Sequence, residues 1–210
     1  MKFEDSDMAS FTITVPDIHQ GTGYLWYGVQ APATGARLLV DANGNPQGGT
    51  PFAMGASEGA ATFHMEAKIE EIAIDQETAP VDAVMTAESA YIELTLKESS
   101  LGKISKALAH ASFSSGTDTG LPAGAQSYEE ITVGGLVTVP QASVALVSPR
   151  RGFSAPGKFM VACLYNAYAK DPFQIGFTRT KEAVYKVRFD GLAVLSRTQG
   201  DRVGQFYRQT

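Results

Sequence analysis

Short runs of alternating apolar and polar residues recur along most of this 210-residue chain, and turn-forming residues separate many of them. Such alternation is typical of strands that bury one face of a sheet, while clusters of Gly, Pro, Asn and Asp favour turns. The runs therefore predict a mainly β protein. The predicted strands cover residues 11–15, 24–29, 37–40, 63–70, 90–97, 129–139, 142–147, 158–165 and 183–194.

The predicted strand at 63–70 (FHMEAKIE) has a competing helical interpretation, because Met65, Ile69 and Ile72 also follow a helical spacing. The two-residue alternation is cleaner, since apolar residues from Phe63 to Ile69 interleave with His64 and charged residues. A period of two places all the apolar side chains on one face of a strand. We therefore favour a strand for this segment.

Residues 86–109 (TAESAYIELTLKESSLGKISKALA) change from one period to another. The first half alternates as a strand, with apolar side chains at Ile92, Leu94 and Leu96. The second half spaces them three and four apart, as an amphipathic helix does, at Leu101, Ile104 and Leu108. Ser99 or Ser100 is suited to cap the helix start, whereas Gly102 weakens it. The pattern predicts a short helix at about residues 100–110 that packs on a sheet, because it is too short to persist alone.

The overall composition predicts a single domain spanning residues 1–210, because a chain of this length with 44% hydrophobic residues buries one substantial core. Charged residues make up only 19% of the chain, which suits a surface covered by neighbouring subunits. The net charge of −5 and the lack of a basic run argue against gripping nucleic acid through phosphates. No signal region or long apolar stretch is present, so we expect a soluble protein made in the cytoplasm, without a membrane partner.

Two long stretches, residues 42–60 and 111–126, are predicted to be loops because they are rich in Gly, Ala, Ser and Thr. Loops of this length inside a compact domain are usually functional or disordered. The first stretch carries Phe52 and Met54 among glycines. These two side chains either fold back onto the parent core or contact another subunit, and we take them as candidates for inter-subunit contact.

Several motifs suggest chemistry but lack the context that the chemistry needs. GASEG at 55–59 matches the G-x-S-x-G serine turn, with Asp75 or Asp82 and then His110 in the chain order of a hydrolase, but no βαβ alternation supports that fold. GFSAPGKF at 152–159 matches a phosphate loop, yet Phe159 replaces the magnesium-binding hydroxyl and a strand follows. We predict no catalytic residue and no enzyme activity.

Metal and ligand sites are also not indicated. The three histidines, His19, His64 and His110, are isolated from one another, and only His64 has a neighbouring acid, Glu66, on the same strand face. The lone Cys163 lies in an apolar run and is expected to be buried and unreactive. Tyr24 and Trp26 share a strand face and suggest either core packing or a sugar-stacking platform. We predict no metal and no cofactor.

The strand and helix of YIELTLKESSLGKISKALA, preceded by IDQETAPVDAVMTAESA, resemble the joint between a long strand and a flanking helix in the tail tube proteins of long-tailed bacteriophages. The final EAVYKVRFDGLAVLSRTQGDRVGQFYRQ resembles the last strands of that family. The resemblance covers about half of the chain. It implies a β-sandwich or barrel with one flanking helix, assembling into stacked, hexameric rings that form a DNA conduit in the virion tail.

That family implies further expectations for partners and residues. Tape-measure, terminator and baseplate proteins would be partners, assembly would occur in the bacterial host cytoplasm, and DNA would pass without specific binding. Acidic side chains facing the lumen would repel DNA phosphates, and the candidates at polar strand positions are Glu66, Glu70, Glu93 and Glu129. The alternatives are a tail terminator or another ring-forming tail or neck protein, and a monomeric carbohydrate-binding β-sandwich.

Overall fold

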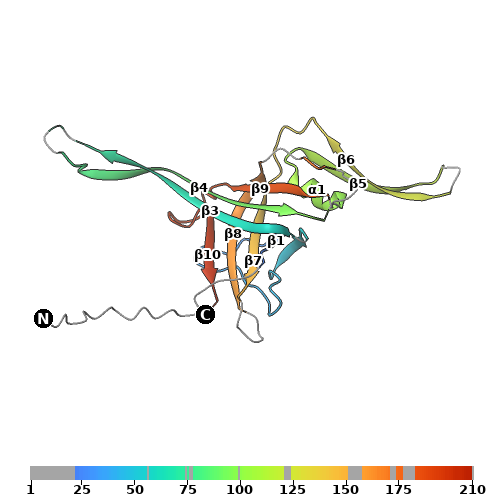
Figure 1. The fold of residues 1–210 in the computed structure, drawn as a ribbon, viewed down its shortest axis with the longest axis horizontal. Coiled ribbons are helices and arrows are strands. Elements are labelled where there is room, and N and C mark those ends of the chain that lie inside the picture. The colour runs from blue at the N-terminus through green and yellow to red at the C-terminus, as the bar shows by residue number, and fades with distance from the viewer. Residues whose placement is uncertain are drawn as a thin grey trace, which may run out of the picture.

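The computed structural model describes residues 22–55, 57–73, 75, 78–98, 100–120, 124–150, 158–170, 174–176 and 183–209. Within these ranges the protein is built from ten strands and one helix (Figure 1). Their bounds, in chain order, are β1 Tyr24–Val29, β2 Gly49–Ala53, β3 Ser57–Ile72, β4 Asp82–Leu96, α1 Leu101–Ala107, β5 Ala111–Asp118, β6 Gln126–Val133, β7 Ala142–Pro149, β8 Phe159–Ala169, β9 Tyr185–Gly191 and β10 Gly204–Arg208.

Eight of the strands form one antiparallel sheet in the order β2-β1-β7-β8-β9-β4-β3, and β10 is an additional partner of β8. The sheet divides at β8, because residues 160–164 pair with β10 whereas residues 167–169 pair with β9. β9, β4 and β3 then fold across β1, β7 and β8. The described strands do not close into a barrel, so the predicted mainly β fold with one short helix is confirmed as a β-sandwich.

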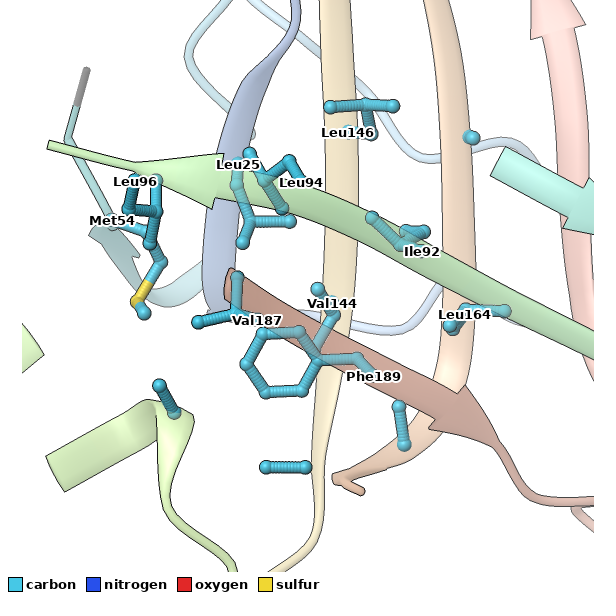
Figure 2. Close-up of a cluster of buried hydrophobic side chains, with 14 of the residues drawn as sticks. Leu25, Met54, Ile92, Leu94, Leu96, Val144, Leu146, Leu164, Val187 and Phe189 are labelled. Atoms are coloured by element: carbon cyan, nitrogen blue, oxygen red, sulfur yellow. The ribbon is translucent and has the colours of Figure 1, made fainter. Parts of the chain in front are cut away.

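The main core lies between the two layers of the sandwich. Side chains of β4 and β9 point toward those of β1, β7 and β8, with Met54 at one side (Figure 2). The alternation in β4 explains its contribution, since every second residue from Ala90 to Leu96 is buried. At the start of β3 the layers meet closely, because a Cβ added at Gly23 would lie 2.9 Å from the Ala61 Cβ. The largest fully buried side chains of this core include Leu25, Ile92, Leu96, Val144, Tyr185 and Phe189.

A second core covers the opposite face of β1, β7 and β8, so β8 is buried on both faces along much of its length. Arg197 holds the covering segments in place: its guanidinium donates hydrogen bonds to the carbonyls of Pro32 (2.6 Å) and Asp201 (2.8 Å) and stacks on the Tyr165 ring at 3.6 Å. Asp201 in turn accepts a 2.5 Å hydrogen bond from the Tyr165 hydroxyl. This buried arginine therefore links residues 32 and 201 over the second core.

Helix α1 confirms the predicted change of period but not the predicted cap. Ile104 and Ala107 are buried against the main core, and Leu101 and Leu108 pack at its edge. Ser100 occupies the N-cap position without a side-chain hydrogen bond to the helix, and Ser99 lies outside the described residues. Instead, a Glu129 carboxylate oxygen on β6 accepts a 3.2 Å hydrogen bond from the Leu101 amide. A residue distant in sequence therefore stabilises the helix start.

Most predicted strands are present, with two differences. Residues 37–40 form only an isolated bridge between Val40 and Pro46, although Leu38 is still buried and Leu39 exposed. The strand predicted for 129–139 ends at Val133, because Gly134 and Gly135 adopt positive φ angles of 110° and 75°. The segment 63–70 is a strand, as favoured, within β3. The strand expected at 11–15 lies outside the described residues.

About half of each stretch predicted to be a loop is strand, so the loop prediction is wrong for those residues. Residues 49–53 form β2, β3 begins at residue 57, and residues 111–118 form β5. Alternation does not mark these strands because β2 and β5 are mostly exposed and carry Gly, Ser and Thr on both faces. Backbone pairing with β1 and β6 holds them instead.

Candidate assembly surfaces

Two hairpins extend away from the sandwich in opposite directions (Figure 1). One is formed by the distal parts of β3 and β4, residues 65–72 and 82–89, which we call the arm. The other is β5 paired with β6, a separate two-stranded sheet that contacts the rest of the protein beside α1. Each is a two-stranded ribbon, and a ribbon without a covering layer leaves both of its faces in solvent.

The arm continues the face of β3 and β4 that is buried in the sandwich. Cross-strand partners lie on the same face of a sheet, and Phe63 pairs with Ile92, Met65 with Ala90, and Ile69 with Met85. The register shifts by one residue at a bulge at Thr86, so that Met85 and Ala83 lie on the same face as Ala90. We call the exposed apolar side chains on the continuation of this face the apolar stripe; they are Met65, Ala67, Ile69, Ala83 and Met85, and Glu71 and Glu88 lie on the same face beside them.

The apolar stripe is not covered by any described part of the chain. Met65, Ile69 and Met85 are 62%, 60% and 54% exposed, respectively. Single exposed apolar side chains are common, but several neighbouring ones on a projecting element are typical of an interaction site. The stripe is therefore the strongest candidate surface for binding another molecule.

The charges of the protein are segregated between the hairpins and the sandwich. The arm carries five acidic side chains and one lysine, and the β5–β6 hairpin carries three acidic side chains and no basic one. The described remainder of the chain has 12 basic and 7 acidic side chains. The acidic residues of the arm are Glu66, Glu70, Glu71, Asp82 and Glu88.

The four candidate lumen acids lie on different elements. Glu66 and Glu70 lie together on the exposed polar face of the arm. Glu93 forms an ion pair with Lys186 of β9 at 2.9 Å, and Glu129 lies on β6 and caps α1. By the register of β3 and β4, Glu93 lies on the same face as Glu66 and Glu70, nearer the sandwich, whereas Glu129 lies on the hairpin that extends in the opposite direction (Figure 1).

The two candidates for inter-subunit contact have different environments. Met54 is 0% exposed, packs in the main core and donates its amide to the Leu25 carbonyl at 2.9 Å. Its assignment as a contact to another subunit is therefore wrong, because no neighbour reaches a side chain that its own core encloses. Phe52 on β2 is 38% exposed and stays a candidate.

The serine motif does not form a catalytic arrangement in this fold. Ser57 pairs with Leu96 at one end of the β3–β4 hairpin, whereas Asp82 pairs with Ile72 at the other end, roughly 50 Å away at the rise of a strand. The Ser57 hydroxyl donates a 3.4 Å hydrogen bond to the Gly23 carbonyl. A strand rather than a helix also follows Lys158, so the phosphate-loop context is not met, and residues 151–157 lie outside the described ranges.

The other reactive side chains have structural roles. Burial raises the pKa of the Cys163 thiol to about 12, which keeps it protonated and unreactive at neutral pH. His64 stacks on Tyr91 with ring centroids 4.6 Å apart and lies 3.6 Å from Glu66, whereas His19 lies outside the described residues. Within the described chain, no group of three or more His, Cys, Asp or Glu side chains is placed to hold a metal ion.

The proposed sugar platform is not formed by Tyr24 and Trp26. Trp26 packs against the second core and its indole nitrogen is enclosed, whereas Tyr24 is 52% exposed at the strand end. A platform needs an open ring face, and only the Tyr24 ring is open to solvent. The packing alternative therefore holds for Trp26.

The chain matches no protein-family model, and no curated protein matches its sequence. The described part of the protein also has no helix long and apolar enough to span a membrane, since α1 has seven residues.

Proposed function

We propose that this protein is a structural subunit that assembles with copies of itself into stacked rings, forming the tail tube of a long-tailed bacteriophage. The observation that carries the proposal is the apolar stripe of the arm, whose side chains lie in solvent although they continue the face that forms the main core. Burial of such a stripe by a neighbouring copy would supply the covering layer that one chain lacks.

The architecture supports an assembly role over a catalytic or ligand-binding role. The motifs for a serine nucleophile and a phosphate loop are not supported by the described geometry, and Met54 and Trp26 are used for packing. Low charge content, an acidic net charge and two projecting hairpins suit a self-assembling conduit for DNA. Under this proposal Glu66 and Glu70 are the acids placed on an exposed face to contribute to a lumen, and no cofactor or enzymatic step is involved.

The proposal places the protein in the virion tail, with tape-measure, terminator and baseplate proteins as neighbours. A terminator or neck protein would share the same subunit architecture but form a single ring. Electron microscopy distinguishes the two, because only a tube subunit stacks into long hollow particles.

The experiment compares a variant of the apolar stripe with a control on the opposite face of the arm. The double change Ile69→Ser/Met85→Ser removes two exposed apolar side chains from the stripe, and Val84→Ser removes one from the other face. Light scattering at rising concentration and negative-stain microscopy should show rings or tubes for the natural protein and for Val84→Ser, and monomers for the stripe variant. A natural protein that stays monomeric at high concentration, or a stripe variant that assembles normally, contradicts the proposal.

A further inference from the structure

A groove lies on the open side of the sandwich, between β3 and β10. In the described chain β3 pairs only with β4 and β10 only with β8, so the two strands face each other without a ladder. Phe63 and Phe206 stack across this opening with ring centroids 5.7 Å apart. The groove has a volume of about 450 Å³, and its lining includes Ala61, Phe63, Leu146, Met160, Ala162 and Phe206.

The lining of the groove is continuous with the main core. Leu146 and Ala162 belong to that core, and Phe63 packs at its edge. Phe206, by contrast, is 51% exposed. A second hollow of about 260 Å³ adjoins the first, shares Phe63 and Met65 with it, and reaches Arg202 and Val203. The open side therefore presents apolar core surface to solvent beside the root of the arm.

Basic side chains lie at the rim of this groove. Arg208 is exposed and lies two residues after Phe206 on β10. Because side chains alternate along a strand, both lie on the same face. Lys158 lies two residues before Met160, immediately before the first residue of β8. Arg202 lines the adjoining hollow. The rim thus combines an apolar floor with positive charge.

The arm has the complementary properties. Its apolar stripe matches the apolar floor of the groove, and Glu71 and Glu88, the two acidic residues on the same face as the stripe, are opposite in charge to Lys158, Arg202 and Arg208. Opposite charges at such a contact favour the correct partner and speed encounter. Met65 lies at the edge of the groove, whereas the distal part of the stripe, Ile69 and Met85, is not part of its lining, so each subunit carries both halves of a contact.

We propose that the groove between β3 and β10 is the docking site for the arm of a second copy of this chain. This inference rests on the proposed self-assembly and names the surface that receives the arm. A contact between two different surfaces of identical chains is head-to-tail, and repetition of such a contact produces rings or filaments rather than closed pairs. The docked stripe would cover both the exposed core surface of the groove and its own apolar side chains.

The test is disulfide cross-linking, for which the natural protein is well suited because its single cysteine is fully buried. Ile69→Cys labels the stripe, and Met160→Cys labels the groove. After mild oxidation of a mixture, peptide mass spectrometry should find residue 69 of one chain joined to residue 160 of another. The matched control, Val84→Cys mixed with Met160→Cys, presents its thiol on the opposite face of the arm and should cross-link at least tenfold more slowly.

Charge provides a second readout of the same contact. Lys158→Glu/Arg208→Glu in the chain that carries Met160→Cys should slow cross-linking about tenfold, and raising the ionic strength should slow cross-linking of the unmodified pair. Circular dichroism of the charge variant should match that of the natural protein, since both side chains lie at the rim. An unchanged rate with both treatments would contradict the charged part of the contact.

Other occupants of the groove give distinct results that overturn the inference. Ile69→Cys chains that dimerise efficiently through residue 69 alone would show that two arms pair with each other. An intrachain disulfide in an Ile13→Cys/Met160→Cys variant would show that the chain's own N-terminal segment occupies the groove. Rings or tubes that form without a 69–160 disulfide would overturn the docking site while leaving the proposed function intact, whereas the absence of any assembly contradicts both.

Discussion

Ile92 and Ile69 lie in the same hairpin and on the same face of it, yet their environments are opposite. Ile92, in the part of β4 that crosses the sandwich, is 0% exposed, whereas Ile69, in the arm, is 60% exposed. Both strands are antiparallel, continuous and regularly paired through this region except for one bulge. The difference arises because β1, β7 and β8 lie opposite Ile92, while no described element lies opposite Ile69 (Figures 1 and 2).

The comparison shows that alternation predicts on which side of a strand a residue lies, but not whether anything covers that side. In the sandwich, a second layer covers the apolar side chains, and together they form the core. In the arm, the same pattern produces an exposed apolar stripe. An apolar pattern that continues where no described element covers it marks a candidate site for binding another molecule. Four predictions test this contrast between the sandwich and the arm.

The largest effect is expected from truncating the buried isoleucine. Ile92→Ala should lower the free energy of unfolding by about 2–5 kcal/mol, because it leaves a cavity in the main core. The matched change Ile69→Ala should alter it by less than about 0.5 kcal/mol in the dilute, unassembled protein. Urea denaturation followed by circular dichroism measures both. Equal losses at the two positions would show that the arm is covered within a single chain.

A smaller loss is expected where the arm's root joins the sandwich. Gly23→Ala would place a Cβ 2.7 Å from a Leu146 methyl group and 2.9 Å from the Ala61 Cβ, which forces the two layers apart. We expect a loss of about 1–3 kcal/mol in unfolding free energy, typical of overpacking. Gly120→Ala is the control, because an added Cβ there meets no atom within 4 Å. An unchanged free energy of unfolding for Gly23→Ala would mean that the first residues of β3 move to make room for the added methyl group.

The polar network of the second core should make the stability of the sandwich sensitive to acid. The hydrogen bond from Tyr165 is the main reason that the pKa of Asp201 lies below its usual value, with the Gly35 amide and Arg197 also lowering it and burial opposing them. A lowered folded-state pKa adds stability above the unfolded pKa of about 4, and this stability is lost as the pH falls through the folded pKa.

Asp201→Asn should therefore cost about 1–2 kcal/mol at pH 7 and progressively less below about pH 4, where the natural carboxylate becomes protonated. Urea denaturation across pH 2.5–7 measures the difference between the two proteins. Asp118→Asn on exposed β5 should leave the curve unchanged. A constant difference between the Asp201 variant and the natural protein at all pH values would contradict the titration of this carboxylate.

The smallest effect concerns the second hairpin, which is tied to the sandwich through α1. Glu129→Gln removes the negative charge beside the Leu101 amide and should lower stability by about 0.3–1 kcal/mol. Hydrogen exchange of the first α1 amides should accelerate several-fold. Glu130→Gln, on the neighbouring position of β6, is the control and should leave exchange in α1 unchanged. Faster exchange in both variants would assign the effect to hairpin charge rather than to the cap.

Several features were predictable from the sequence because they depend on neighbours along the chain. The strands with strong alternation, the change of period at residues 86–109 and the burial of Cys163 all follow from local residue patterns. β2 and β5 were missed because their exposed, small and polar residues give no periodic signal. The cap on α1 was assigned to a nearby serine because sequence reasoning has no means of seeing Glu129, which lies 28 residues away.

The candidate surface likewise depends partly on neighbours along the chain and partly on distant segments. The residue pattern alone indicates that Met65, Ala67 and Ile69 share one face of a strand and that charged residues alternate with them. The three-dimensional arrangement was needed to see that this face projects beyond the sandwich, that Met54 turns into the core, and that an apolar groove opens between β3 and β10. The physical reason is that a strand's period depends on its own backbone, whereas burial depends on which distant segments lie opposite it.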